Sequence, residues 1–211
     1  MKIEGNGITI SYDICGDGSW FTLVHGAGDN SGIWYNQLPA FSGNYKTLTL
    51  DMRGHGASGV PDGPYDIDAY VSDLSALLTA LKVDKTVLLG HSLGGRVALA
   101  YTMCYPQRVS ALVLSNAPVA MRDREAAGQR AGGQRPGPQP VTDMAAAIDR
   151  RISVFFSEGF AAANKDVMER YRQIDMRSSP EGYTKVTQNM RQAIAQQPSV
   201  DELASVVCPT L

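Results

Sequence analysis

Four short apolar runs constrain the fold of this chain more than any other feature of its sequence. They cover residues 20–25 (WFTLVH), 47–51 (TLTLD), 86–90 (TVLLG) and 109–115 (VSALVLS). Near-continuous apolar runs of this length are typical of strands buried on both faces, as in a parallel sheet. The runs therefore favour a core in which a mostly parallel sheet is covered by helices on both faces.

Helical patterns lie between these runs. Residues 66–81 place apolar side chains at i, i+3, i+4 and i+7, and residues 93–105 form a second pattern that Pro106 would end. A short hairpin is expected before them over residues 3–14, with its turn at Asn6-Gly7. Strands that alternate with helices indicate βαβ units with right-handed crossovers. We therefore predict an α/β core with a mostly parallel, doubly wound sheet over residues 1–121.

The composition changes after this core. Residues 122–140 (RDREAAGQRAGGQRPGPQP) are rich in Gly, Pro, Arg and Gln, which predicts a flexible linker. Residues 141–198 contain helical patterns and no strand pattern, which predicts a helical cap inserted after the 109–115 strand. Residues 199–211 end in the apolar stretch LASVVCPTL and are expected to start the returning core strand.

Composition disfavours several classes of function. The 211 residues are 44% hydrophobic and 19% charged, and the net charge of −2 favours neither nucleic acid nor an anionic membrane as a partner. The three cysteines are widely spaced and form no CxxC motif, so we expect no disulfide framework and no metal site. Cys15 and Cys104 are expected to be buried as small apolar residues. Because no signal-peptide pattern or long apolar segment is found, we expect a cytoplasmic location and no membrane span.

The sequence Gly90-His91-Ser92-Leu93-Gly94 matches the G-x-S-x-G pattern of a nucleophile elbow. It lies between an apolar strand and a helical pattern, which is the context that this motif requires. A sharp strand-to-helix turn would lift the Ser92 hydroxyl clear of the sheet and leave no room for side chains at the flanking glycines. Ser92 is therefore the candidate nucleophile, and a glycine-rich turn without catalytic function is the alternative.

A serine that attacks an acyl group needs two N–H donors for the oxyanion that forms. The residue after the nucleophile, Leu93, supplies one backbone N–H, and Ala27 in the loop after residues 20–25 is the candidate for the second. Gly26 and Trp34 lie in and after the same loop and are expected to contact the substrate. The His25 side chain is expected to bind backbone groups of this loop rather than to act on the substrate.

Three segments, residues 25–28 (HGAG), 51–58 (DMRGHGAS) and 90–95 (GHSLGG), resemble the α/β-hydrolase fold superfamily in order and spacing. The chain is most similar to its small serine esterases, enol-lactonases and cofactor-free haloperoxidases. The resemblance covers residues 1–120 and, weakly, the cap. It implies hydrolysis of a small ester, lactone or related acyl substrate through an acyl-Ser92 intermediate, without cofactor or metal. It also implies a structural role for residues 51–58, including His55.

The catalytic acid and base expected from this resemblance are not found in the chain. In the superfamily they follow the serine, whereas all three histidines of this sequence precede Ser92. His91 adjoins Ser92, and on a strand its side chain is expected to point to the opposite side. In the superfamily the catalytic acid can also follow the strand at residues 109–115, but that position is Asn116 here. The amide of asparagine cannot carry the negative charge of a carboxylate. We therefore expect acid, base and last strands outside this chain, with a second chain as one source, and little activity from these 211 residues alone.

Two other functions remain open at this stage. Gly26, Gly28 and Gly32 after one strand, with Asp51 at the end of the next, resemble the fingerprint of a Rossmann-type dinucleotide-binding oxidoreductase domain, although the third glycine falls one position late. A non-catalytic binding module with the hydrolase fold would keep the pocket without turnover. Arg96, two residues past Gly94, is expected to be a solvated helix residue.

Overall fold

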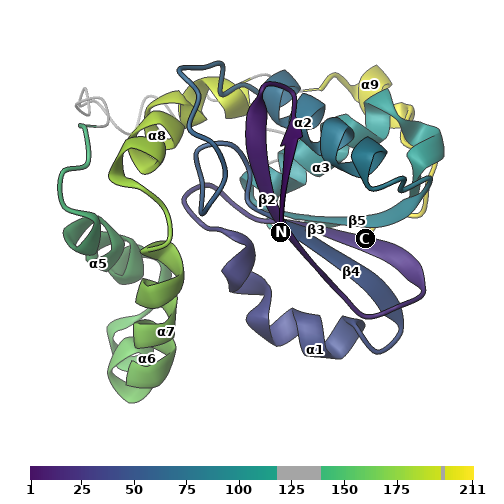
Figure 1. The fold of residues 1–211 in the computed structure, drawn as a ribbon. Coiled ribbons are helices and arrows are strands. Elements are labelled where there is room, and N and C mark those ends of the chain that lie inside the picture. Colours follow the sequence, from purple (N-terminus) through teal and green to yellow (C-terminus); the bar gives the residue numbers. More distant parts are fainter. Residues whose placement is uncertain (118–138, 196–197) are drawn as a thin grey trace.

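The structure is a computed structural model that describes residues 1–117, 139–195 and 198–211. The described residues form a sheet with the strand order β1-β2-β4-β3-β5-β6 (Figure 1). The strands are β1 (Lys2–Gly5), β2 (Ile8–Cys15), β3 (Ser19–Val24), β4 (Tyr45–Leu50), β5 (Thr86–His91) and β6 (Val109–Ser115). β2 pairs antiparallel with β1 and β4, whereas the pairs β3–β4, β3–β5 and β5–β6 are parallel. The predicted mostly parallel sheet is therefore confirmed.

Helices cover both faces of this sheet, with α2 and α3 on one face and α1 on the other (Figure 1). The helices in and around the core are η1 (Ser31–Asn36), α1 (Gln37–Phe41), α2 (Ile67–Ala80), α3 (Leu93–Cys104), η2 (Pro106–Arg108) and α9 (Val200–Ala204), where η denotes a 3₁₀ helix. Four more helices among the described residues lie between β6 and α9 and are called the cap helices below: α5 (Met144–Phe155), α6 (Glu158–Ala163), α7 (Lys165–Asp175) and α8 (Pro180–Ala195).

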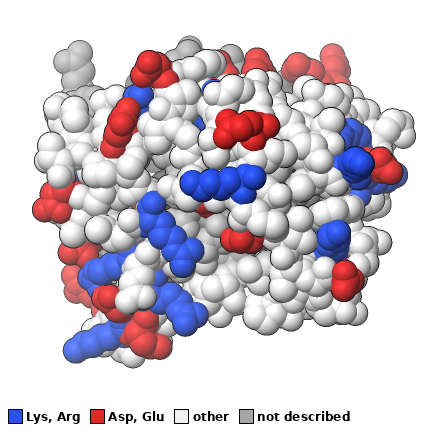
Figure 2. All heavy atoms as spheres, viewed as in Figure 1, with Lys and Arg blue, Asp and Glu red and all other residues white. Residues whose placement is uncertain are grey.

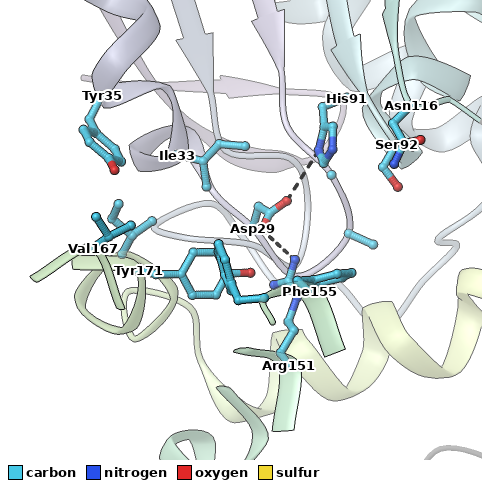
Figure 3. Close-up of a pocket in the computed structure, with 14 residues that line it drawn as sticks. Asp29, Ile33, Tyr35, His91, Ser92, Asn116, Arg151, Phe155, Val167 and Tyr171 are labelled. Carbon is cyan, nitrogen blue, oxygen red and sulfur yellow. Dashed lines mark hydrogen bonds and ion pairs between the residues drawn. The ribbon is translucent and has the colours of Figure 1, made fainter. Parts of the chain in front are cut away.

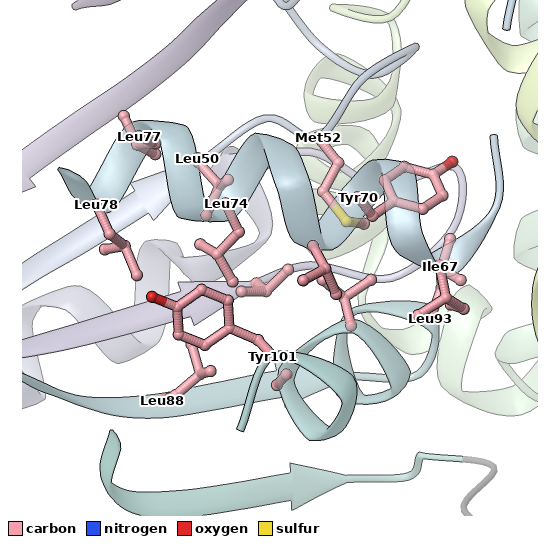
Figure 4. Packing of buried hydrophobic residues seen from close by; sticks show 14 of the residues in the cluster. Leu50, Met52, Ile67, Tyr70, Leu74, Leu77, Leu78, Leu88, Leu93 and Tyr101 are labelled. Atoms are coloured by element: carbon pink, nitrogen blue, oxygen red, sulfur yellow. The ribbon is translucent and has the colours of Figure 1, made fainter. Parts of the chain in front are cut away.

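Helix α2 shows how the sequence pattern produces the core. The helix begins where the Asp66 carboxylate accepts a hydrogen bond of 2.9 Å from the backbone N–H of Ala69. Leu74, Leu77 and Leu78 recur at helical spacing and are each at most 1% exposed. They pack on side chains from β4, β5 and α3 (Figure 4). The apolar stripe of α2 therefore fixes the helix on the sheet.

The predicted hairpin is also observed. Asn6 and Gly7 join β1 and β2 and have φ angles of 51° and 75°, which a two-residue type I′ turn requires at both positions. Short helices were harder to predict, because α1 and α6 each span fewer than two full turns and show little periodicity.

The C-terminal segment differs from the prediction. Residues Val200–Ala204 form helix α9 instead of entering a strand, because Ser199 and Glu202 make a reciprocal capping box that favours a helix start. Strand-like pairing begins only at Pro209, whose carbonyl accepts a 2.9 Å hydrogen bond from Leu112 of β6. Thr210 forms a parallel β-bridge with Leu112.

Three expectations about single residues were wrong. Cys15 and Cys104 are exposed, because each is the last residue of its strand or helix and extends past the core. Arg96 is buried, with 4% exposure, instead of solvated. It lines a small depression formed by Ile67 at the start of α2 and by Pro198 and Glu202 around α9, so the C-terminal segment covers it.

The cap helices have their own apolar cluster around Met144, Ile148, Ile152 and Met168. They also contact the core, since the Asn30 side chain donates a 2.6 Å hydrogen bond to the carbonyl of Ile174. The flexible linker predicted over residues 122–140 lies largely outside the described residues. Within the described parts of the chain, no helix combines the length and hydrophobicity needed to cross a bilayer.

Candidate active site

A cavity of about 430 Å³ lies where the loops after β3, β5 and β6 meet the cap helices (Figure 3). The core contributes Ala27, Ser92 and Asn116 to its lining, and the cap helices contribute Phe155 and Tyr171. A volume of this size is typical of sites for small molecules. The carboxyl ends of parallel strands are the usual position of such sites in open α/β sheets.

Ser92 occupies a sharp turn between β5 and α3. Its φ and ψ angles are 51° and −115°, which is a strained conformation for a residue with a side chain. The surrounding backbone holds the strain, because the N–H of Ser92 donates to the carbonyl of Ser115 and its carbonyl accepts from Gly95. The turn places Ser92 in the lining of the cavity, directly before the N-terminus of α3.

The glycines around Ser92 are required by close backbone packing. A Cβ atom added at Gly90 would lie 2.2 Å from the carbonyl oxygen of Gly94. A Cβ atom added at Gly94 would lie 2.3 Å from the carbonyl oxygens of both Val24 and His25. The elbow therefore packs directly against the end of β3, which brings the loop after β3 next to Ser92.

The loop after β3 approaches the serine as predicted. A Cβ atom added at Gly26 would lie 3.3 Å from Cβ of Ser92, and both Gly26 and Ala27 line the cavity. Among the described residues, the backbone N–H groups of Ala27 and Leu93 have no hydrogen-bond acceptor. Two N–H groups free in this way, one on each side of a serine, could bind an oxyanion.

Two buried histidines connect the loop after β3 with the loop after β4. Nε2 of His25 accepts a 3.0 Å hydrogen bond from the N–H of Met52, and Nε2 of His55 accepts a 3.0 Å hydrogen bond from the N–H of Gly28. Each loop thus supplies an imidazole that binds the backbone of the other. The two rings contact each other edge to face, with 4.8 Å between their centroids.

These contacts fix both histidines in the neutral state. Nδ1 of His25 donates to the carbonyl of Gly26, and Nδ1 of His55 donates to the carbonyl of Arg53, so Nε2 must remain the unprotonated acceptor. Complete burial lowers the pKa of His25 to about 4 and the pKa of His55 to about 3. Both side chains are therefore loop-binding residues, as the sequence predicts for them.

His91 lies in the cavity next to Ser92, which corrects the expectation that it would point away. Strand alternation ends here, since Ser92 leaves the strand conformation. Figure 3 shows the His91 ring turned towards Asp29, and its Nδ1 lies 3.8 Å from Oδ2 of that carboxylate. The imidazole is 35% exposed, so it remains accessible from the cavity.

Arg151 of α5 connects the core with the cap helices. One of its terminal nitrogens lies 2.6 Å from Oδ1 of Asp29, and the other lies 3.1 Å from Oδ2 of Asp175 in α7. Burial raises the pKa of the Asp175 carboxyl to about 7, although the Arg151 guanidinium beside it acts in the opposite direction. Asp29, Arg151 and Asp175 therefore form one buried cluster of charged groups between the core and the cap helices.

Trp34 does not belong to the cavity lining among the described residues. Its side chain is buried with Phe21 and Leu23 on the α1 face of the sheet. Ile33 and Tyr35, its neighbours, line the cavity instead. The substrate contact expected for Trp34 is therefore wrong, because a 3₁₀ helix turns successive side chains about 120° apart.

Asp51 argues against a dinucleotide site. Its carboxylate accepts backbone hydrogen bonds of 2.8 Å from Ser31 and 2.9 Å from Ala57, and the residue is only 5% exposed. A ribose hydroxyl would have to displace these bonds. The contacts agree with the structural role that the resemblance implies for residues 51–58.

Sequence reasoning missed Asp29, Arg151 and most of the apolar lining. No local motif surrounds Arg151, and its ion pair with Asp29 joins residues that are 122 positions apart. Only the position of Asp29, three residues beyond Gly26, could have indicated a place near the site.

Comparison with known proteins identifies the family. The sequence model described as the alpha/beta hydrolase fold matches residues 20–200. This match spans most of the chain, so the chain belongs to the α/β-hydrolase fold family.

Individual relatives are hydrolases. The chain is 30% identical over 166 residues to 3-oxoadipate enol-lactonase 2 of Acinetobacter baylyi, which covers 79% of this chain and 60% of that protein. It is 35% identical over 121 residues to 2-hydroxy-6-oxo-2,4-heptadienoate hydrolase of Pseudomonas putida, covering 56% of this chain and 44% of that protein. A crystal structure of a hydrolase from Pseudomonas aeruginosa superposes with a TM-score of 0.82 and 27% identity, covering 100% of this chain and 77% of the other. The chain thus matches only part of each protein.

Proposed function

We propose that residues 1–211 carry the nucleophile of a serine hydrolase that cleaves a small ester, lactone or related acyl substrate through an acyl-Ser92 intermediate. The observation that carries this proposal is the strained elbow, which holds Ser92 in the cavity lining beside the loop of Gly26 and Ala27. Membership in a family whose relatives include a lactonase supports the same reaction class.

The reaction follows from this arrangement. Oγ of Ser92 attacks the acyl carbon, and the carbonyl oxygen becomes an oxyanion that accepts hydrogen bonds from the N–H groups of Leu93 and Ala27. The base considered below takes the Oγ proton and passes it to the leaving group, which departs as the carbonyl re-forms. Water then attacks the acyl-enzyme, and the same base takes a proton from the water and returns it to Oγ. The N-terminus of α3 adds partial positive charge near the developing anion.

The proposal requires a base, since a serine hydroxyl is a weak nucleophile at neutral pH. His25 and His55 are occupied by backbone groups, and the His91 ring is turned towards Asp29. Asn116 lines the cavity on the β6 side but carries no charge. We therefore propose that the catalytic acid and histidine come from outside these 211 residues, either from further residues of a longer chain or from a second chain.

Covalent labelling tests the nucleophile. In the complete gene product, a fluorophosphonate should modify Ser92, and Ser92→Ala should abolish both the labelling and the hydrolysis of p-nitrophenyl acetate. Ser153→Ala, at an exposed position on α5, is the matched control and should leave both unchanged. A complete protein that folds but is neither labelled nor active would favour a non-catalytic binding module.

A second comparison tests the source of the base. Residues 1–211 alone should turn over p-nitrophenyl acetate at least about 10³-fold more slowly than the complete gene product, because removing the base leaves only the oxyanion donors and substrate binding. Equal turnover by both would show that the base lies within the 211 residues, and His91→Ala would then be the next variant to measure.

A further inference from the structure

We propose that this cavity selects substrates whose acyl group is uncharged, because the arginine that lines it is already neutralised by Asp29 and Asp175. The inference rests on the proposed function and adds the class of substrate to it. Within the described lining of the cavity, Arg151 is the only lysine or arginine. This guanidinium is the permanent positive charge with which a substrate carboxylate could pair in the described lining.

Both terminal nitrogens of the guanidinium already bind internal carboxylates. Its two terminal nitrogens bind different carboxylates, at 2.6 Å to Asp29 and 3.1 Å to Asp175. The side chains of Arg151, Asp29 and Asp175 are 10%, 6% and 0% exposed, so water screens these pairs little. An incoming carboxylate would have to displace an internal carboxylate and leave it buried without a partner, which is unfavourable.

Aromatic rings cover the remaining faces of the guanidinium. Its central carbon lies 5.2 Å from the ring centroid of Phe155 and 5.8 Å from that of Tyr171. Figure 3 shows Tyr171 and Phe155 around Arg151, with Asp29 beyond it. These cation–π contacts help to hold the guanidinium in place.

The rest of the lining suits an apolar group. Ile33, Val167 and Ile174 contribute aliphatic side chains, and Phe156 adds another aromatic ring. The carboxylate of Asp29 is the only aspartate or glutamate in the described lining, and it faces both Arg151 and His91. A negative acyl group would therefore meet apolar walls and an aspartate, which makes its desolvation costly.

The test compares two esters of nearly equal shape in the complete gene product. Ethyl 4-methylpentanoate is uncharged, whereas monoethyl succinate has a carboxylate in place of its terminal isopropyl group. At pH 8, with hydrolysis followed by base titration, kcat/KM should be at least about 100-fold higher for the uncharged ester. Ser92→Ala should abolish hydrolysis of both esters.

Two variants test whether the ion pairs of Arg151 cause the selectivity. Asp175→Asn and Asp29→Asn each release one arm of Arg151, and each should raise kcat/KM for monoethyl succinate about tenfold relative to the uncharged ester. Asp149→Asn is the matched control, because it also removes an aspartate that pairs an arginine between α5 and α7, but at the exposed pair with Arg172. Asp149→Asn should leave the ratio of the kcat/KM values for the two esters unchanged.

The outcomes separate the two proposals. A ratio near one in the wild type, with turnover that depends on Ser92, would overturn the selectivity and leave the serine hydrolase in place. A high ratio that neither aspartate variant lowers would also overturn it, and the wild-type ratio alone decides if both variants fail to fold. Absence of Ser92-dependent hydrolysis with either ester would overturn both proposals.

Discussion

At the scale of single residues, Gly94 has no room for a side chain. We predict that Gly94→Ala lowers the free energy of unfolding by at least about 2 kcal/mol, because the new methyl group would meet the carbonyl oxygens of Val24 and His25 at 2.3 Å. Urea unfolding of wild type and variant measures the difference. Backbone atoms on a central strand cannot turn away as a flexible side chain could.

Gly43→Ala provides the control, since no heavy atom lies within 4 Å of the added Cβ. Its stability should stay within about 0.5 kcal/mol of the wild type. Equal stability of the two alanine variants would show that α3 and β3 do not pack as closely as described.

The sequence could predict parts of the site only where residues that are neighbours in the chain form a local motif. Ser92 and Ala27 were located from the sequence because an elbow and a glycine-containing loop are formed by neighbouring residues. Asp29 and Arg151 were not, because a lone arginine on an amphipathic helix has the same pattern whether it faces solvent or a buried aspartate. Such pairs depend on how distant elements pack.

At the scale of elements, a buried ion pair attaches α2 to the loop after β4. Nε of Arg53 lies 2.6 Å from Oδ2 of Asp73, and its Nη2 lies 2.6 Å from Oδ1, with both side chains 4% exposed. We predict that Asp73→Asn lowers the free energy of unfolding by about 3–5 kcal/mol, because it leaves the guanidinium buried without its counter-charge. Chemical denaturation monitored by circular dichroism measures this loss.

The exposed Asp84, just beyond the end of α2, is the matched site for the same substitution. Asp84→Asn should change stability by no more than about 0.5 kcal/mol. If Asp73→Asn proved as mild as this control, the ion pair would contribute little to the attachment of α2.

Regular elements were predictable because burial imposes a period on the sequence. The apolar runs became β3 to β6, and the stripe over residues 66–81 became α2 within one residue at each end. The tail was misjudged because its apolar composition is typical of a strand, whereas the capping box at Ser199 and Glu202 determines a helix start. Capping and tertiary contacts therefore outweigh composition in short segments.

At the scale of the whole molecule, stability should depend on pH through three buried groups. Below pH 6.5 the unfolded chain protonates His25 and His55, whereas the fold keeps them neutral until about pH 4 and 3, so their stabilisation is lost as the pH falls. Asp175 acts in the opposite direction: its pKa rises from 3.8 to about 7 on folding, so its contribution is lost as the pH rises. Between pH 4.5 and 6 we therefore predict that the free energy of unfolding rises with pH by about 1.4 kcal/mol per pH unit, because two histidines outweigh one aspartate.

Two variants separate these contributions in urea unfolding between pH 4.5 and 6. Asp175→Asn should steepen the increase to about 2.7 kcal/mol per pH unit, because it removes the opposing group. His55→Gln should flatten it to about zero, since one histidine then balances Asp175. Identical slopes in all three proteins would contradict the assignment of these groups as the source of the pH dependence.

The position of Arg151 has a consequence for how such a protein can change. Charges are concentrated over the cap helices on the face seen in Figure 2, where blue and red side chains alternate, and on the inner side the Arg151 guanidinium joins α5 and α7 to Asp29 of the core. Under the selectivity proposed above, Arg151 would both set the electrostatic preference of the cavity and join the core to the cap helices that line it. A mutation at Arg151 is then expected to alter both the substrate preference and the attachment of the cap helices, so these two properties would evolve together.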